Sequence, residues 1–253
     1  MRKTNRIGEN SINKQGLKMK IIEYRRNDDI TVKFEDDYAC ESQYVLFQKG
    51  SIKNPYFRET QGVGYIGEGK YKPSINNKLT IQYKYWMSMF YRCYNEDYHK
   101  KENTYIDCFV CEEWHNYQSF GKWFDENYYE IENEVMQIDK DILIKGNKIY
   151  SPKNCVFVPR SINNLFVKND KVRGKYPIGV TERNNGYQAR LNKNTKDIKL
   201  RISLGVFDTP QQAFNAYKIA KENYIKKVAN DYKGKIPNNL YNAMINYKVE
   251  MTD

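Results

Sequence analysis

Hydrophobic and polar residues alternate in the first part of the chain, as they do in half-buried strands. Segments 17–26 and 29–38 show this alternation, and 44–52 is a third apolar stretch that ends beside a glycine. The pattern predicts a small β half-barrel of three antiparallel strands over residues 1–58. The glycine-rich segment 59–80 after it predicts a linker or an extended loop.

The spacing of apolar residues becomes helical in the middle of the chain. Intervals of three and four residues predict two helices between residues 81 and 130. Their apolar faces consist of Tyr85, Met89 and Cys93 in the first helix, and of Trp114, Tyr117, Phe120 and Phe124 in the second. Strand-like sequence returns in VMQIDKDILI and CVFVP. We expect residues 81–168 to form one domain.

The last third of the chain combines three alternating segments with one amphipathic helix. Its strands are YPIGVTER, GYQARLNK and DIKLRISL, and Thr209 and Gln212 form a capping box at the start of the helix. The helix covers the apolar face of the sheet and leaves the polar face exposed. We expect a domain over 176–253, ending in a short helix, with 168–175 as a linker and with fragment 171–253 able to fold alone. The whole chain is then an α+β protein.

Basic residues are concentrated in this last third. Residues 171–253 hold 16 Lys and Arg against 7 Asp and Glu, whereas residues 81–170 hold 11 against 14. A basic segment favours a polyanionic partner, because neutralising phosphates releases counterions. No apolar run reaches the roughly 18 residues of a membrane span. We therefore expect no membrane partner and a soluble protein of the bacterial cytoplasm, associated with the nucleoid.

The five cysteines raise the question of a metal site. Cys93, Cys108, Cys111 and Cys155 could close a structural zinc site, but only one CxxC pair is present. An odd number of cysteines argues against a disulfide framework. We favour ordinary buried thiols and keep zinc as the alternative.

The polar face of the C-terminal sheet is the first candidate site. Arginine can bind guanine, and asparagine or glutamine can bind adenine, in a major groove that admits β-strands. Four side chains of this face, Gln188, Arg190, Asn192 and Arg201, are of these types. An ordinary solvated face with incidental cations is the alternative interpretation.

A resemblance favours the DNA-binding interpretation. Segments Ile178–Val180, Tyr187–Leu191, Leu204–Thr209 and Ala213–Tyr217 resemble the DNA-binding domain of plant ethylene-response factors, which also occurs in phage and mobile-element endonucleases. In that family the exposed sheet face contacts DNA. The resemblance therefore implies contacts from Thr181, Arg183, Gln188, Arg190, Asn192, Lys199 and Arg201. The plant domain has arginine and tryptophan at the positions of Thr181 and Tyr187, so its target sequence does not carry over.

Residues 85–165 resemble the phage HNH (ββα-metal) endonucleases, and the half-barrel resembles a segment often joined to them. The similar segments include Trp86–Met89, Val110–Trp114, Ile138–Asp141 and Tyr150–Cys155. In an active member, a histidine on the first strand accepts a proton from water while a divalent cation such as Mg²⁺ is held near the scissile phosphate. Lys140 takes the place of that histidine, and a protonated lysine is no general base. The residues left to bind metal or phosphate in this degenerate site are Asp139, Lys140, Asp141 and Asn154.

These patterns lead to one hypothesis and two alternatives. The hypothesis is a sequence-specific duplex DNA-binding protein of phage or mobile-element type with an inactive HNH-like nuclease domain. The first alternative is an active homing-type endonuclease or nickase. The second is a phage inhibitor or regulator that acts on a host nucleic-acid-binding protein.

Overall fold

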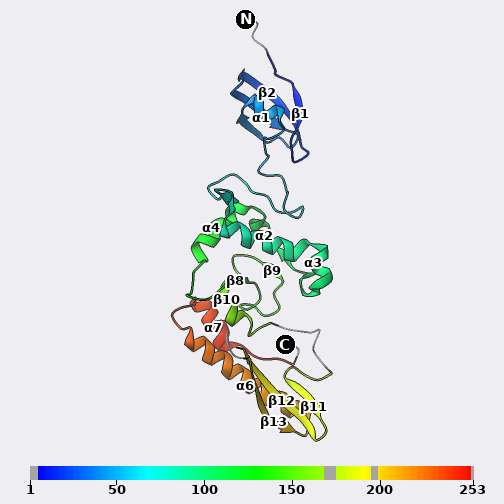
Figure 1. Ribbon diagram of the computed structural model, residues 1–253, viewed down its shortest axis with the longest axis vertical. Helices are drawn as coiled ribbons and strands as arrows, with labels where there is room; N and C mark the ends of the chain where they lie inside the picture. Colours follow the sequence, from blue (N-terminus) through cyan, green and yellow to red (C-terminus); the bar gives the residue numbers. More distant parts are fainter. Residues whose placement is uncertain (1–4, 168–174, 195–198, 252–253) are drawn as a thin grey trace. The chain divides into compact units, whose positions relative to one another are not determined.

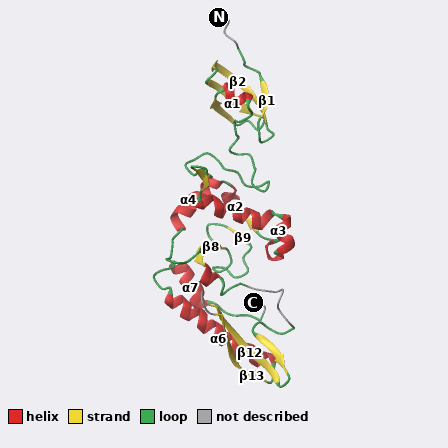
Figure 2. Cartoon of the chain, in the orientation of Figure 1, coloured by secondary structure: helices red, strands yellow, loops and turns green. Residues whose placement is uncertain are grey.

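The computed structural model describes residues 5–167, 175–194 and 199–251. The chain forms two compact units, Met1–Phe124 and Asp125–Asp253. The helices and strands of both are labelled in Figure 1. Both units combine helices with small antiparallel sheets (Figure 2), so the predicted α+β class is confirmed. None of the described helices combines the length and the apolar composition that crossing a lipid bilayer requires.

The first unit begins with an antiparallel sheet of four strands, one more than the sequence predicts. Segment 44–52 does not form a strand, because Tyr44 and Phe47 are buried at helical spacing in a short helix. A run this short does not distinguish a strand from a helix by its periodicity. The elements are β1 (Asn10–Ile12), β2 (Lys18–Arg26), β3 (Asp29–Phe34), β4 (Ala39–Ser42) and α1 (Tyr44–Gln48).

Segment 59–80 is an ordered loop held by the side chain of Gln118. That side chain accepts a hydrogen bond from the Tyr71 backbone N–H at 2.9 Å and donates to the Ile66 and Tyr71 carbonyls at 3.1 and 2.9 Å. A two-stranded hairpin, β5 (Ser74–Ile75) and β6 (Lys78–Leu79), closes the segment. The glycine-rich composition therefore marks a packed loop instead of a flexible connection.

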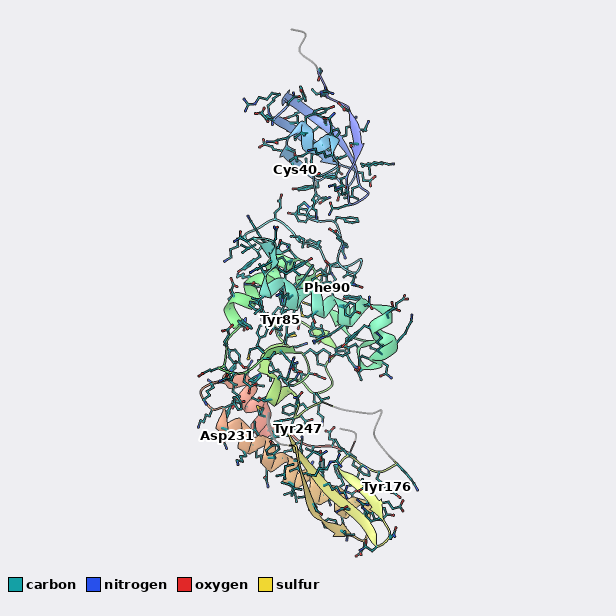
Figure 3. All side chains as sticks on the ribbon, viewed as in Figure 1. Cys40, Tyr85, Phe90, Tyr176, Asp231 and Tyr247 are labelled. Carbon is teal, nitrogen blue, oxygen red and sulfur yellow. The ribbon has the colours of Figure 1, made fainter. Side chains whose placement is uncertain are left out.

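Aromatic side chains form the helical core of the first unit. The Trp86 and Phe90 rings lie 4.6 Å apart between centroids, as do the Trp114 and Trp123 rings. The predicted second face is confirmed in part: Trp114, Tyr117, Phe120 and Phe124 are all buried, but Trp114 lies in a separate 3-10 turn that precedes the helix. Phe90 and Tyr85 are marked in Figure 3. The elements are α2 (Ile81–Tyr94), α3 (Glu96–Lys101), η1 (Asn103–Tyr105), β7 (Phe109–Val110), η2 (Glu112–His115) and α4 (Tyr117–Asn127).

The second unit begins with a short antiparallel pair followed by one helical turn. Strand β8 (Met136–Asp139) pairs with β10 (Val156–Pro159), and α5 (Arg160–Asn163) follows directly. Residues 140–155 between the two strands form a long loop that contains β9 (Ile149–Tyr150).

The C-terminal sheet has the three strands that the sequence predicts. They are β11 (Val180–Arg183), β12 (Gly186–Asn194) and β13 (Lys199–Phe207), paired antiparallel in that order. The capping box is confirmed: the Thr209 hydroxyl accepts from the Gln212 backbone N–H, and the Gln212 side-chain Oε1 accepts from the Thr209 backbone N–H, both at 3.2 Å. The helices are α6 (Pro210–Asp231) and α7 (Asn238–Asn246).

Helix α6 packs on the sheet through the first part of its length. Ala213, Phe214 and Tyr217 share a core with Val180 and Ala189 of the sheet. Strand β11 begins only after Gly179, whose φ is +78° and whose added Cβ would lie 2.1 Å from the Tyr217 ring. Only glycine leaves room here for the helix to approach the sheet so closely.

The second part of α6 belongs to a different core. Ile225 and Ala229 are buried with Val158 of β10, Ile162 of α5 and Leu240 of α7. Fragment 171–253 would expose this surface, so the structure argues against its folding alone and against a domain boundary near residue 168. The periodicity showed which face of the helix is buried, but it does not show which partner covers that face. The expected linker lies largely outside the described residues, which resume at 175.

Two isoleucines of α6 provide a test of this shared core. Ile225 is fully buried, whereas Ile219 is 62% exposed on the same helix. Ile225→Ala should lower the free energy of unfolding by about 2–5 kcal/mol, because it leaves a cavity. Ile219→Ala should change it by no more than about 0.5 kcal/mol. Urea unfolding of both variants measures the difference, and equal small effects would contradict the shared core.

Candidate nucleic-acid interface

The C-terminal sheet presents one face to α6 and one face, here called the outer face, away from it. Val180, Ala189 and Leu191 point to the helix and are buried. Alternation along the strands places the opposite set on the outer face. Its described members are Thr181, Arg183, Gln188, Arg190, Asn192, Arg201, Ser203 and Val206, each exposed or half-buried.

Strand pairing arranges these side chains in rows across the sheet. Thr181 lies opposite Gln188, and Gln188 lies opposite Val206. Arg190 lies opposite Ser203, and Asn192 lies opposite Arg201. The ionisable side chains described on this face are arginines, so its electrostatic potential is positive.

A hydrogen-bonded chain orients one end of the outer face. Arg183 Nε donates to Gln188 Oε1 at 3.0 Å, and Gln188 Nε2 donates to Ser203 Oγ at 3.0 Å. Both ends of the Gln188 amide are thereby fixed. This arrangement holds donors and acceptors in place before a ligand arrives, which reduces the entropy cost of binding.

The structure brings together six of the seven residues that the sequence predicts for this face. The seventh, Lys199, belongs to β13, but its side chain lies outside the described residues. Val206 was missed by the sequence-based assignment, because strict alternation from Arg201 and Ser203 turns it toward the helix. Its place on the outer face depends on a β-bulge that only the strand register shows.

The four residues of the degenerate site lie close together around the loop between β8 and β10. Asp139 Oδ1 accepts hydrogen bonds from the Asp141 and Ile142 backbone N–H groups at 2.9 and 2.7 Å. Asn147 connects the other two: its Nδ2 donates to the Lys140 carbonyl at 2.6 Å, and its Oδ1 accepts from Asn154 Nδ2 at 3.0 Å. The side chains therefore stabilise the loop itself.

Lys140 is largely removed from solvent. Only 8% of the residue is exposed, and its Nζ lies 3.4 Å from Asp141 Oδ2. A buried ammonium group depends on such a partner, because desolvation opposes the charged form. Direct binding of a DNA phosphate by Lys140 does not fit this placement, although the sequence left it open.

The degenerate site does not suit a divalent cation. One oxygen of Asp139 is taken by two backbone N–H groups, the ammonium group of Lys140 neighbours Asp141, and the Asn154 amide is directed to Asn147. Mg²⁺ requires several free oxygen ligands. Over the described parts of the chain, no three His, Cys, Asp or Glu side chains gather as a metal site.

The same finding applies to the zinc alternative. Cys93, Cys108 and Cys155 are buried and Cys111 is half-buried, and none of these four described cysteines forms a disulfide. Cys108 Sγ lies 3.7 Å from the Thr104 carbonyl. Cys93, Cys108 and Cys111 belong to the first unit and Cys155 to the second, and the choice between buried thiols and a zinc site stays a prediction.

Comparison of the chain with known protein families, with curated proteins and with solved structures gives no match. The functional proposal below therefore rests on the fold and on the two candidate sites.

The buried carboxyl of Asp139 leads to a prediction about pH. Burial, followed by the negative charge of Asp141, raises the pKa of Asp139 from 3.8 to about 6. The folded protein then binds more protons than the unfolded chain between these values, so the free energy of unfolding should fall as pH rises from 4 to 6. By linkage the loss is on the order of 2–3 kcal/mol.

Asp139→Asn keeps the oxygen that accepts the two hydrogen bonds and removes the titration. Its free energy of unfolding, measured in urea at pH 4.5 to 7.5, should lack the loss that the parent shows between pH 4 and 6. In Asp141→Asn the loss should be smaller and should end at lower pH, since one cause of the raised folded-state pKa is gone. Parallel pH profiles for the parent and Asp139→Asn would contradict the assignment.

Proposed function

We propose that this chain is a sequence-specific duplex DNA-binding protein and that the outer face of the C-terminal sheet contacts the bases. The observation that carries the proposal is the composition of this face: three arginines, two amides and two hydroxyls stand in register on a rigid sheet. These are the side chains that form hydrogen bonds with base edges in the major groove. The concentration of Lys and Arg in residues 171–253 supports the same conclusion.

The packing of α6 supports specific recognition over loose charge attraction. The sheet rests on Phe214 and Tyr217, and the far end of the same helix is buried in a second core. Base recognition requires side chains held by a rigid scaffold. An ordinary solvated face would not require the fixed orientation of Gln188 between Arg183 and Ser203.

The proposal assigns a structural role to the HNH-like segment. Lys140 stands where the resemblance expects the general base, and it is buried with its Nζ 3.4 Å from Asp141 Oδ2. Strand β10 and α5 also supply Val158 and Ile162 to the core that anchors α6. In a phage or mobile-element protein this segment would then support the DNA-binding sheet. Such a role accounts for the lysine at position 140 and for the contribution of β10 and α5 to the core around α6.

Substitution of the outer-face arginines tests the proposal. Arg190→Ala and Arg201→Ala should each weaken binding to a selected duplex by about 1–3 kcal/mol and relax specificity at one base position. Lys227→Ala, an exposed position of α6, removes the same charge away from the sheet and serves as the control. Titrations at two salt concentrations separate base contacts from charge attraction. Equal affinity of the Arg190→Ala, Arg201→Ala double variant and the parent would overturn the proposal.

The structural role of the HNH-like segment predicts no cleavage. The full-length chain should leave supercoiled plasmid intact with Mg²⁺ or Mn²⁺, because Lys140 stands at the position where the resemblance expects the histidine that activates water. Agarose gels measure the nicked fraction. Metal-dependent nicking that disappears in Asp139→Ala would establish an active endonuclease and refute this part of the proposal.

A further inference from the structure

One row of the outer face differs in chemistry from the others. It runs across all three strands and consists of Thr181, Gln188 and Val206, called here the Gln188 row. This row holds no charged side chain, and Val206 at its end is an aliphatic residue that is 45% exposed. The neighbouring rows contain Arg190 and Arg201 and can bind guanine.

A β-bulge places Val206 in this row. The register steps from the Arg190–Ser203 pair to the Ala189–Gly205 pair, so Leu204 is an extra residue on β13. Gly205 has a φ of +122°, a conformation that side-chain-bearing residues rarely adopt. The extra residue reverses the alternation, so that Phe207 turns to the core and Val206 turns outward. Bulges commonly re-aim side chains next to functional sites.

The Val206 side chain is held in position by its surroundings. An added Cβ at Gly186 would lie 3.2 Å from Val206 Cγ1, so the valine rests against a glycine that leaves room for it. A β-branched side chain has few χ1 rotamers. An apolar surface fixed in this way loses little entropy when a ligand covers it.

The chemistry of the row matches an A·T base pair. In the major groove, a glutamine amide can bind adenine N6 and N7, and an apolar side chain can contact the 5-methyl group of thymine. Gln188 and Val206 are direct cross-strand neighbours, whose Cβ atoms lie about 5 Å apart in antiparallel sheets. The Thr181 methyl group adds a second apolar contact on the other side of Gln188.

We propose that the Gln188 row recognises A·T base pairs, with the Val206 side chain against a thymine 5-methyl group. This inference rests on the proposed function and adds the class of base that one part of the sheet selects. The target is then a mixed site, in which A·T pairs beside the Gln188 row adjoin G·C pairs contacted by the arginine rows.

Uracil substitution tests the inference directly. A preferred site is first selected from a randomised duplex library with the full-length chain. Each thymine of that site is then replaced singly by uracil, which removes only the 5-methyl group, and dissociation constants are measured by fluorescence anisotropy. At one or two positions the parent should lose about threefold to fivefold in affinity, the contribution of one buried methyl group.

Three variants test whether the sensitivity to uracil comes from the Val206 side chain. Val206→Ala should abolish the sensitivity to uracil at one of those positions. Val206→Ile should keep it, because the aliphatic surface remains. Leu200→Ala removes an exposed aliphatic side chain outside the row and should behave as the parent does. Thermal unfolding of each variant confirms that the fold is intact.

The outcomes separate this inference from the proposed function. A preferred sequence whose thymines show no Val206-dependent uracil effect would overturn the inference and leave specific DNA binding in place. If the library gives no preferred sequence, the proposed function fails and the inference fails with it.

Discussion

The burial of one helix against two different cores is the constraint on which the second unit depends. The first part of α6 covers the C-terminal sheet, and its later part contacts β10, α5 and α7. Tyr247, which follows α7, packs against both cores, and it is marked in Figure 3. A helix of 22 residues spans about 33 Å. The sheet therefore cannot move independently of β10, α5 and α7 without exposing apolar surface.

The same constraint gives the loop between β8 and β10 a structural role. Hydrogen bonds of Asp139, Asn147 and Asn154 close this loop. Strand β10 places Val158 in the core that also buries Ile225 of α6. The loop contacts therefore stabilise the pair of strands against which the second part of α6 packs.

The outer face illustrates how far alternation predicts a site. The placement of Arg190, Asn192 and Arg201 follows from period-two patterning, because their neighbours Leu191 and Ile202 are apolar. Val206 was not predictable in this way, since a bulge moves every later residue of the strand to the opposite face of the sheet. Gly205 was a signal for that bulge, because an isolated glycine in a strand pattern often marks one.

The sequence by itself determined the α+β class, the three C-terminal strands and the capped start of α6. Each of these features depends on residues that are close together in the sequence. Tertiary structure alone decided that segment 44–52 begins with a helix, that segment 59–80 is held by Gln118, and that α6 joins two cores. It also decided that Lys140 is buried against Asp141. These features depend on which distant surfaces meet, and periodicity shows only that a surface is buried.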